Sequence, residues 1–311
     1  MHVEIKSTNK GSVYPLKGVD LQVGAEETVG LVGESGCGKS MILRTILRML
    51  PHGGYQTKGK ISLNGDRIDK TGDKYFETIR GRKISMIFQD PVSALSPLMR
   101  VGDQISDIYR YNVHATKVEG WDLSLNLLEA LGIVNPKNVA QRYPHQMSGG
   151  MAQRINIAMA MVCEPQLLLA DEPTTALDVT VQAQIIKLIK ELKETNNMSV
   201  IWVTHDLGVV AGIADYIIVM YNGMIVEKGR INDIYSSPKH PYTIGLINSA
   251  SRNIINNRYS MIEGLPPDGS EINKGCCFYK RCSKRLNICE HKIPPSVKIN
   301  KDHYFSCYLE D

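Results

Sequence analysis

Residues 33–40 read Gly-Glu-Ser-Gly-Cys-Gly-Lys-Ser, which is the spacing of a phosphate-binding loop. Glycines let the backbone fold closely around an anion, and the start of the helix predicted to follow adds partial positive charge. We expect Lys39 to reach the β- and γ-phosphates of a nucleotide and the Ser40 hydroxyl to hold Mg²⁺. The residues expected to contact ATP are Gly33, Glu34, Ser35, Gly36, Cys37, Gly38, Lys39, Ser40 and Met41.

Two adjacent carboxylates, Asp171 and Glu172, follow an apolar run at residues 167–170. Ligands gather at the carboxyl ends of parallel strands, so we expect Asp171 to hold Mg²⁺ beside Ser40. Glu172 is then the group expected to orient or deprotonate the attacking water. Alone, such a pair would more often be a solvated strand end; the phosphate-binding loop is what favours the catalytic interpretation.

Two further polar residues end predicted core strands. Gln89 follows the apolar run at residues 84–88, where it can reach the metal or the water, and His205 follows the strand at residues 200–204, where it can contact the γ-phosphate. The sequence Ser-Gly-Gly at residues 148–150 begins a helix and predicts a second anion-binding helix terminus. One nucleotide does not need two such anion-binding sites, so the second is expected to bind the nucleotide of another chain.

Five of the seven cysteines lie between residues 276 and 307. In a reducing compartment this clustering indicates a metal site before it indicates disulfides, which stay the alternative. Four thiolates are the ligand set of a [4Fe–4S] cluster or of tetrahedral zinc. The predicted ligands are Cys276, Cys282, Cys289 and Cys307. Nearby basic residues are expected to keep these thiolates ionised, namely Lys280, Arg281, Lys284 and Arg285.

Composition is that of an ordinary globular protein, with 43% hydrophobic and 22% charged residues among 311. The net charge of +4 is spread without a basic block, so it gives no argument for a nucleic-acid partner. The first residues lack the apolar core of a secretory signal. Apolar stretches fall short of the roughly 20 residues that span a bilayer, so any work at a membrane requires docking to another subunit.

These residues need a scaffold of alternating strands and helices. The first 30 residues alternate like paired antiparallel strands, including a strand pattern at Val19, Leu21 and Val23. Residues 91–161 carry helical periodicity, and β/α alternation resumes with strands at 167–170, 200–204 and 216–220 and a helix at 179–193. We predict an α/β phosphate-loop core with an antiparallel β subdomain, a helical insertion at 91–161 and a small cysteine-rich tail. The predicted domains are residues 1–240 and 241–311, with a linker near 264–269.

In their order along the chain these motifs resemble the ATP-binding cassette (ABC) family of transporter ATPases, over about residues 1 to 235. The resemblance implies a head-to-tail dimer in which each ATP lies between one chain's phosphate loop and the other chain's signature. It makes Asp178, in Ala-Leu-Asp at residues 176–178, a dimer contact and His205 the switch histidine. The signature residues that would contact the partner's ATP are Ser148, Gly149, Gly150, Met151 and Gln153. The family stacks adenine on an aromatic residue where this chain has Lys10, which leaves Tyr14 as the candidate.

Several segments resemble the oligopeptide, dipeptide and nickel importer branch of that family. They are residues 88–91, 95–99, 143–150, 238–243 and 275–282, the last resembling the motif Gly-Cys-Pro-Phe-x-x-Arg-Cys with Cys277 in place of proline. The branch implies a heterodimer with a second ATPase subunit, two transmembrane permeases and, indirectly, a substrate-binding protein. The tail is typical of the first of the two ATPase chains, and the branch favours iron–sulfur over zinc. The expected location is the cytoplasmic side of the cell membrane.

The expected function is ATP hydrolysis that energises peptide import. An importer of nickel or a metal chelate is the alternative within the branch, and the cargo itself cannot be read from this chain. A soluble ABC ATPase of translation or DNA repair would usually fuse two cassettes or carry a long coiled coil, and neither is seen. A cassette that binds ATP without hydrolysis would lack Glu172 or His205, and both are present.

Overall fold

The computed structural model describes residues 1–7, 11–175, 177–250, 254–255, 258–259, 262–267, 269 and 274–309. The chain forms two compact units. Unit 1 consists of Met1–Val23, Thr28–Lys70 and Trp202–Asp311, and unit 2 of Gly24–Glu27 and Thr71–Ile201. The cysteine-rich tail therefore belongs to the same unit as the phosphate-binding loop, while the predicted boundary near residue 240 stays a prediction.

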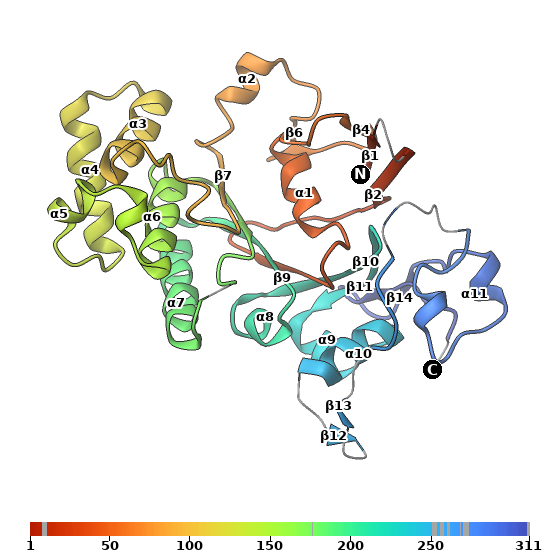
Figure 1. Ribbon diagram of the computed structural model, residues 1–311. Helices are drawn as coiled ribbons and strands as arrows, with labels where there is room; N and C mark the ends of the chain where they lie inside the picture. The colour runs from red at the N-terminus through yellow and green to blue at the C-terminus, as the bar shows by residue number, and fades with distance from the viewer. Residues whose placement is uncertain are drawn as a thin grey trace. The chain divides into compact units, whose positions relative to one another are not determined.

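Unit 1 contains the antiparallel sheet expected at the start of the chain (Figure 1). Its order is β2-β1-β4, formed by Gly11–Lys17, His2–Ser7 and Gly54–Lys58. A short hairpin, β5 (Ser62–Leu63) with β6 (Asp66–Arg67), follows. The strand expected at residues 19–23 does not form. Gly18 turns the chain with φ 104°, and the N–H groups of Gly18 and Val19 both donate to the Met1 carbonyl instead of a strand ladder.

The larger sheet of unit 1 contains a fully buried strand, β3 (Thr28–Val32). β10 (Tyr216–Tyr221) pairs parallel to it, and β11 (Met224–Arg230) pairs antiparallel to β10. β15 (Tyr304–Phe305) then covers β11, and β14 (Val297–Lys298) pairs with β15. The helices of this unit are α1 (Lys39–Ile46), α8 (Leu207–Ile213), α9 (Ile231–Ser236), α10 (Pro241–Ala250) and α11 (Ile288–His291). β9 (Ser199–Thr204) carries the chain from unit 2 into unit 1.

Unit 2 pairs two parallel strands, β7 (Ile84–Ile87) and β8 (Leu167–Asp171), with Ile87 opposite Ala170. Between them in the chain lies the predicted helical insertion, in which α3 (Val101–Val113), α4 (Lys117–Ala130), α5 (Pro136–Ala140) and α6 (Gly149–Met161) lie together (Figure 1). Local sequence fixes helix ends in this unit: Thr116 and Glu119 form a reciprocal capping box at the start of α4, and Asp178 caps α7 (Val179–Asn196), which follows β8. The helices are α2 (Asp73–Glu77), α3 (Val101–Val113), α4 (Lys117–Ala130), α5 (Pro136–Ala140), η1 (Pro144–Gln146), α6 (Gly149–Met161) and α7 (Val179–Asn196).

The tail after residue 250 has little regular structure in its described part. It contains β12 (Ile254–Ile255) paired with β13 (Arg258–Tyr259), the single turn η2 (Tyr279–Arg281), α11, β14 and β15. Phe278 anchors the tail to the core of unit 1. Its ring packs edge-on against Tyr221 of β10 and tilted against Tyr242 of α10. In the part of the chain that the structure describes, no helix is both long and apolar enough to cross a membrane.

Candidate functional site

The loop at residues 33–40 joins β3 to α1, as the sequence predicts. Gly38 has φ 105°, and a Cβ built there would lie 2.4 Å from the Pro15 carbonyl oxygen, so only glycine fits. Gly36 has φ 79°, and apart from its chain neighbours a Cβ there would meet no atom of the described residues within 4 Å. One side of the loop therefore packs tightly on β2, whereas the space beside Gly36 is open for a ligand.

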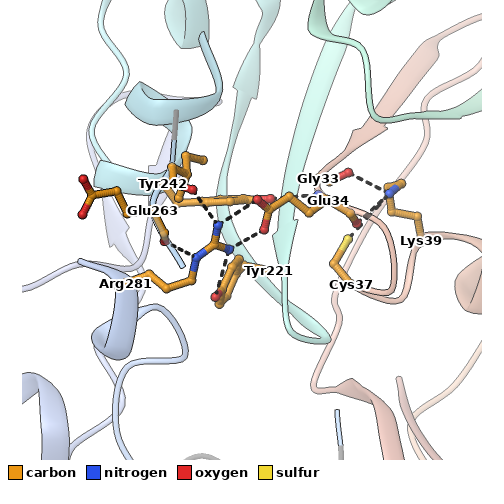
Figure 2. Close-up of polar contacts among 9 residues, drawn as sticks. Gly33, Glu34, Cys37, Lys39, Tyr221, Tyr242, Glu263 and Arg281 are labelled. Atoms are coloured by element: carbon orange, nitrogen blue, oxygen red, sulfur yellow. Dashed lines mark hydrogen bonds and ion pairs between the residues drawn. The ribbon is translucent and has the colours of Figure 1, made fainter. Parts of the chain in front are cut away.

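Lys39 lies across this loop with its side chain almost fully buried. Its Nζ donates to the carbonyl oxygens of Gly33 at 2.7 Å and Glu34 at 3.0 Å, and lies 3.8 Å from the Cys37 sulfur (Figure 2). Burial raises the pKa of the Cys37 thiol, which keeps it protonated at neutral pH. All three acceptors are thus uncharged, and they leave the positive charge of Lys39 uncompensated for a phosphate group.

Helix α1 begins without a side chain at its cap, because its N-cap residue is Gly38. Its first turn contains Lys39, Ser40 and Met41 and no acidic residue. The partial positive charge of the helix dipole at such a terminus favours an anion. The residues of the loop that are predicted to contact ATP therefore lie together at the N-terminus of α1.

Two other predicted site residues of unit 1 lie near the ends of strands. Tyr14 is half-buried on β2, next to Pro15, whose carbonyl adjoins Gly38. His205 is exposed and follows the last residue of β9.

In unit 2 the structure brings Gln89 and Glu172 together, as expected for strand ends that are neighbours in a parallel pair. Gln89 Nε2 donates to Glu172 Oε2 at 3.3 Å, and Thr175 Oγ1 donates to the same oxygen at 2.9 Å. Asp171 is the last residue of β8 and is 3% exposed. Glu172 has φ 46°, a left-handed conformation that is rare for a residue with a side chain and that recurs at functional sites.

The signature residues begin α6. Ser148 is its N-cap, and the Ser148 hydroxyl accepts from the Met151 N–H at 3.3 Å. Ser148 and Gly149 are exposed, and Gly150 and Met151 are partly so. Gln153 differs from them, since it is 1% exposed.

Asp178, the predicted dimer contact, is exposed and caps α7 by accepting from the N–H groups of Thr180 and Val181. Ala176 of the same motif lies outside the described residues.

The loop has a partner that the sequence interpretation missed. Arg281 binds the Glu34 carboxylate through two hydrogen bonds, Nη1 to Oε2 at 2.5 Å and Nη2 to Oε1 at 3.0 Å (Figure 2). The expectation that Arg281 serves the tail thiolates is corrected by this pairing, because the guanidinium is bound to the Glu34 carboxylate instead. The Tyr242 hydroxyl accepts from the Glu34 N–H at 2.8 Å. Arg281 stands in the motif at residues 275–282, which marks the residue but does not indicate its partner.

The four predicted ligand cysteines line one small cavity in the tail, together with His240. All seven cysteines lie among the described residues and are free thiols, so none of them forms a disulfide there. Among the described residues, however, no three His, Cys, Asp or Glu side chains are grouped as they would be around one metal ion. The predicted iron–sulfur or zinc centre therefore gains no support from such a group.

Comparison with known proteins gives the family. A family model described as "ABC transporter" matches residues 16–175, and one described as "Oligopeptide/dipeptide transporter, C-terminal region" matches residues 226–289. The dipeptide transport ATP-binding protein DppD of Bacillus subtilis is 43% identical over 100% of this chain and 93% of its own length. The chain belongs to the ABC transporter ATP-binding proteins of the oligopeptide/dipeptide family. The oligopeptide transport ATP-binding protein OppD of Salmonella typhimurium is 41% identical, over 97% of this chain and 90% of its own.

Solved structures agree with this ABC ATPase fold. A dimeric ATP-binding cassette, MJ0796, in a post-hydrolysis state bound to ADP and phosphate, is 27% identical with a TM-score of 0.65. The match covers 74% of this chain and 99% of that chain. The cbiO1 protein of Clostridium perfringens, 24% identical with a TM-score of 0.62 over 76% of this chain and 90% of its own, shares the fold. The chain is thus an ABC transporter ATPase.

Proposed function

We propose that this ABC ATPase hydrolyses ATP to energise a bacterial importer of oligopeptides or dipeptides. The single observation that carries the hydrolytic part is the Glu172 carboxylate, which Gln89 and Thr175 hold at the end of a core strand. A general base must have such a fixed position within reach of the water it activates. The peptide part is supported by the C-terminal match at residues 226–289 and by the names of the relatives.

Each residue in the proposed site has a role that its chemistry allows. The N–H groups of the loop at residues 33–40 bind the phosphates, and Lys39 compensates their charge. Glu172 takes the proton of the attacking water, His205 contacts the γ-phosphate, and Tyr14 stacks on the adenine. The ligands proposed for Mg²⁺ are Ser40, Gln89 and Asp171, all oxygen donors of the kind this ion takes. When bound, Mg²⁺ neutralises charge that develops on the phosphates.

We further propose that the working unit is a heterodimer with a second ATPase subunit, of which this chain is the first type. Ser148, Gly149 and Met151 would contact the ATP held by that subunit, and Asp178 would lie at the dimer contact. The exposure of Ser148 and Asp178 supports this assignment, whereas buried Gln153 would act by positioning α6. Two permeases would anchor the pair on the cytoplasmic side of the membrane and take peptide from a substrate-binding protein.

Transport in a defined membrane tests the proposal. The chain would be co-purified with its second ATPase and permeases and placed in liposomes with internal MgATP, and uptake of a labelled dipeptide from the binding protein would be measured. Uptake should require ATP and should stop with Glu172→Gln. Accumulation of a nickel chelate in place of peptide would overturn the peptide assignment, and a chain that never co-purifies with permeases would overturn transport altogether.

A second proposal concerns the tail, where we place a [4Fe–4S] cluster on Cys276, Cys282, Cys289 and Cys307. The observation that favours it is that all four thiols, distant in sequence, border the same cavity. A cluster takes one thiolate at each iron atom, so its ligands need not converge on a single point, as those of one zinc ion must. When bound, the group would supply cross-links to a segment that has little core of its own.

Absorption and metal content test the cluster without reference to activity. Protein purified anaerobically should be brown, and Cys282→Ser should remove the colour and loosen only the region after about residue 265. Cys163→Ser, outside the tail, is the matched control and should leave the spectrum unchanged. Colourless protein with stoichiometric zinc, or with no metal at all, would contradict the iron–sulfur assignment.

A further inference from the structure

The peptide of Glu34, the second residue of the phosphate-binding loop, is fixed from both sides. Its N–H donates to the Tyr242 hydroxyl, and its carbonyl accepts from Lys39 Nζ. Its carboxylate is bound by both terminal nitrogens of Arg281 (Figure 2). Two of these three contacts come from residues more than 200 positions later in the chain. The beginning of the loop is therefore held by the C-terminal part of unit 1.

Arg281 is itself held rigidly. Its side chain is 6% exposed, and its Nε donates to the Glu263 carbonyl at 2.8 Å. The guanidinium carbon lies 5.8 Å from the centre of the Tyr221 ring. Paired with Glu34, the guanidinium has its pKa raised further above an already high value, so it stays charged at every physiological pH. A buried guanidinium in a bidentate pair keeps one geometry, because its planar donors match the two carboxylate oxygens.

The position of Arg281 depends on the fold of the tail. Phe278, three residues earlier, packs with ring centroids 5.1 Å from Tyr221 and 5.3 Å from Tyr242. Cys282 follows Arg281 directly and lines the cysteine cavity. The same short segment thus carries an aromatic anchor, the ion-pair partner of the loop and one of the tail cysteines.

A carboxylate in a phosphate-binding loop presents a physical problem. Like charges repel, and an uncompensated Glu34 would disfavour a polyphosphate bound a few residues away. Arg281 removes this repulsion by neutralising the carboxylate and by directing it away into a bidentate pair. A ligand also binds more tightly when its loop is already in the binding conformation, because less ordering is left to occur.

We propose that Arg281 is a positioning residue for nucleotide binding, so that the cysteine-rich tail is a working part of the ATP site. It acts through Glu34, whose charge it neutralises and whose peptide it helps to fix. This inference rests on the proposed assignment of residues 33–40 as the ATP site. It extends that assignment to a segment of the chain well beyond the matched cassette region at residues 16–175.

A double-mutant cycle with Glu34 tests the inference. MgATP is titrated calorimetrically into the purified full-length chain and into Arg281→Gln, Glu34→Gln and the double variant. Arg281→Gln should raise the Kd for MgATP roughly tenfold, which corresponds to about 1.4 kcal/mol. The double variant should regain most of that affinity, because it no longer contains an unpaired carboxylate. A mere loss of folding in the tail would instead leave the double variant as weak as Arg281→Gln.

Further variants separate the possible failures. Arg230→Gln is the matched control, since Arg230 forms an exposed ion pair with Asp302 of the tail at 3.5 Å, and it should leave the Kd within about twofold. Arg281→Lys retains the charge and should lose less affinity than Arg281→Gln, which keeps the test usable if the latter folds poorly. Lys39→Ala should abolish binding; if it does not, the assigned ATP site is wrong. If Lys39→Ala abolishes binding and Arg281→Gln binds normally, the inference about the tail alone is overturned.

Discussion

At the scale of single residues, Glu172 combines a strained backbone with a restrained side chain. Its φ of 46° directs the chain sharply out of β8, while Gln89 and Thr175 hold one carboxylate oxygen. A left-handed conformation costs a residue with a Cβ about 1 kcal/mol or more, and such strain is kept where function requires it. Two donors on one oxygen fix the orientation of the carboxylate, as a general base requires.

Replacing Glu172 with Gln is expected to retain ATP binding and to lower hydrolysis by roughly 10²- to 10⁴-fold, the usual contribution of a general base. The amide preserves size and one acceptor but cannot take the proton. Steady-state phosphate release by the assembled transporter measures the effect. Glu191→Gln, which removes an exposed carboxylate paired with Lys187 on α7, is the matched control and should have normal turnover. Near-normal turnover of Glu172→Gln in the complex would contradict the assignment of the base.

Two glycines of the phosphate loop should respond differently to alanine. At Gly36 the added methyl group meets, apart from its chain neighbours, no described atom within 4 Å, so the expected loss is in MgATP affinity. The cost to the free energy of unfolding should be limited to about 1 kcal/mol of backbone strain. At Gly38 the methyl group would lie 2.4 Å from the Pro15 carbonyl, so stability should fall as well. Calorimetric titration and urea unfolding of both variants measure the two effects. Equal loss of stability in both would show that the space beside Gly36 is not open in solution.

At the scale of elements, β11 holds the tail through a buried carboxylate. Glu227 is fully buried and accepts from the His303 ring at 2.8 Å and from the N–H groups of Lys239 and His240 at 2.8 and 2.9 Å. His303 directly precedes β15, and His240 directly precedes α10. One side chain thus connects β11 to the start of α10, whose Tyr242 accepts from the Glu34 N–H of the phosphate loop, and to β15 of the tail.

Replacing His303 with Ala should lower the free energy of unfolding by about 3 kcal/mol, because a buried carboxylate loses its ring partner. Urea unfolding measures this loss, and hydrogen exchange should show β14 and β15 opening first. The control is His291→Ala, on an exposed side chain of α11, which should change stability by less than about 0.5 kcal/mol. Equal stability of His303→Ala and wild type would indicate that Glu227 finds another donor.

Helices and strands could be predicted from the sequence where the local pattern of apolar residues determines them. The strands β7, β8, β9 and β10 and the helical insertion follow from apolar runs and helical spacing. The segment at residues 19–23 has the alternation of a strand and fails to form one, because a strand also needs a neighbour with free backbone groups. Alternation reports which side chains are buried, and Val19 is indeed buried, without specifying a ladder partner.

At the scale of the whole molecule, only those residues of the candidate site that belong to sequence motifs could be predicted. Lys39, Asp171 and Gln89 could be predicted as site residues because their chemistry needs particular neighbours in sequence. The pairing of Glu34 with Arg281 has no such local signal, because it depends on a tertiary contact between residues 247 positions apart. Gln153 shows that a motif does not determine exposure either. It belongs to the recognisable signature motif, yet its side chain is buried, because burial depends on how α6 packs.

The isolated chain is expected to hydrolyse ATP slowly. In the shared-site proposal, Ser148 completes the site of a neighbouring subunit, so a lone chain lacks that contact. Activity per chain should rise when the second ATPase and the permeases are added, and Ser148→Arg should suppress this rise without weakening MgATP binding to the isolated chain. Sedimentation under assay conditions gives the oligomeric state. A fully active monomer would contradict the shared site.

The cover that β15 provides for β11 has a consequence for how the protein is made. Lys228 leaves the ribosome long before Tyr304, its partner in the sheet. At about 5 to 20 residues per second the intervening chain takes roughly 4 to 15 s to synthesise. During that interval one edge of the core sheet is unpaired, and an unpaired edge can recruit the strand of another nascent chain. Truncated chains that end before residue 297 would keep this edge permanently, so they should accumulate as aggregates even where every cassette motif is intact.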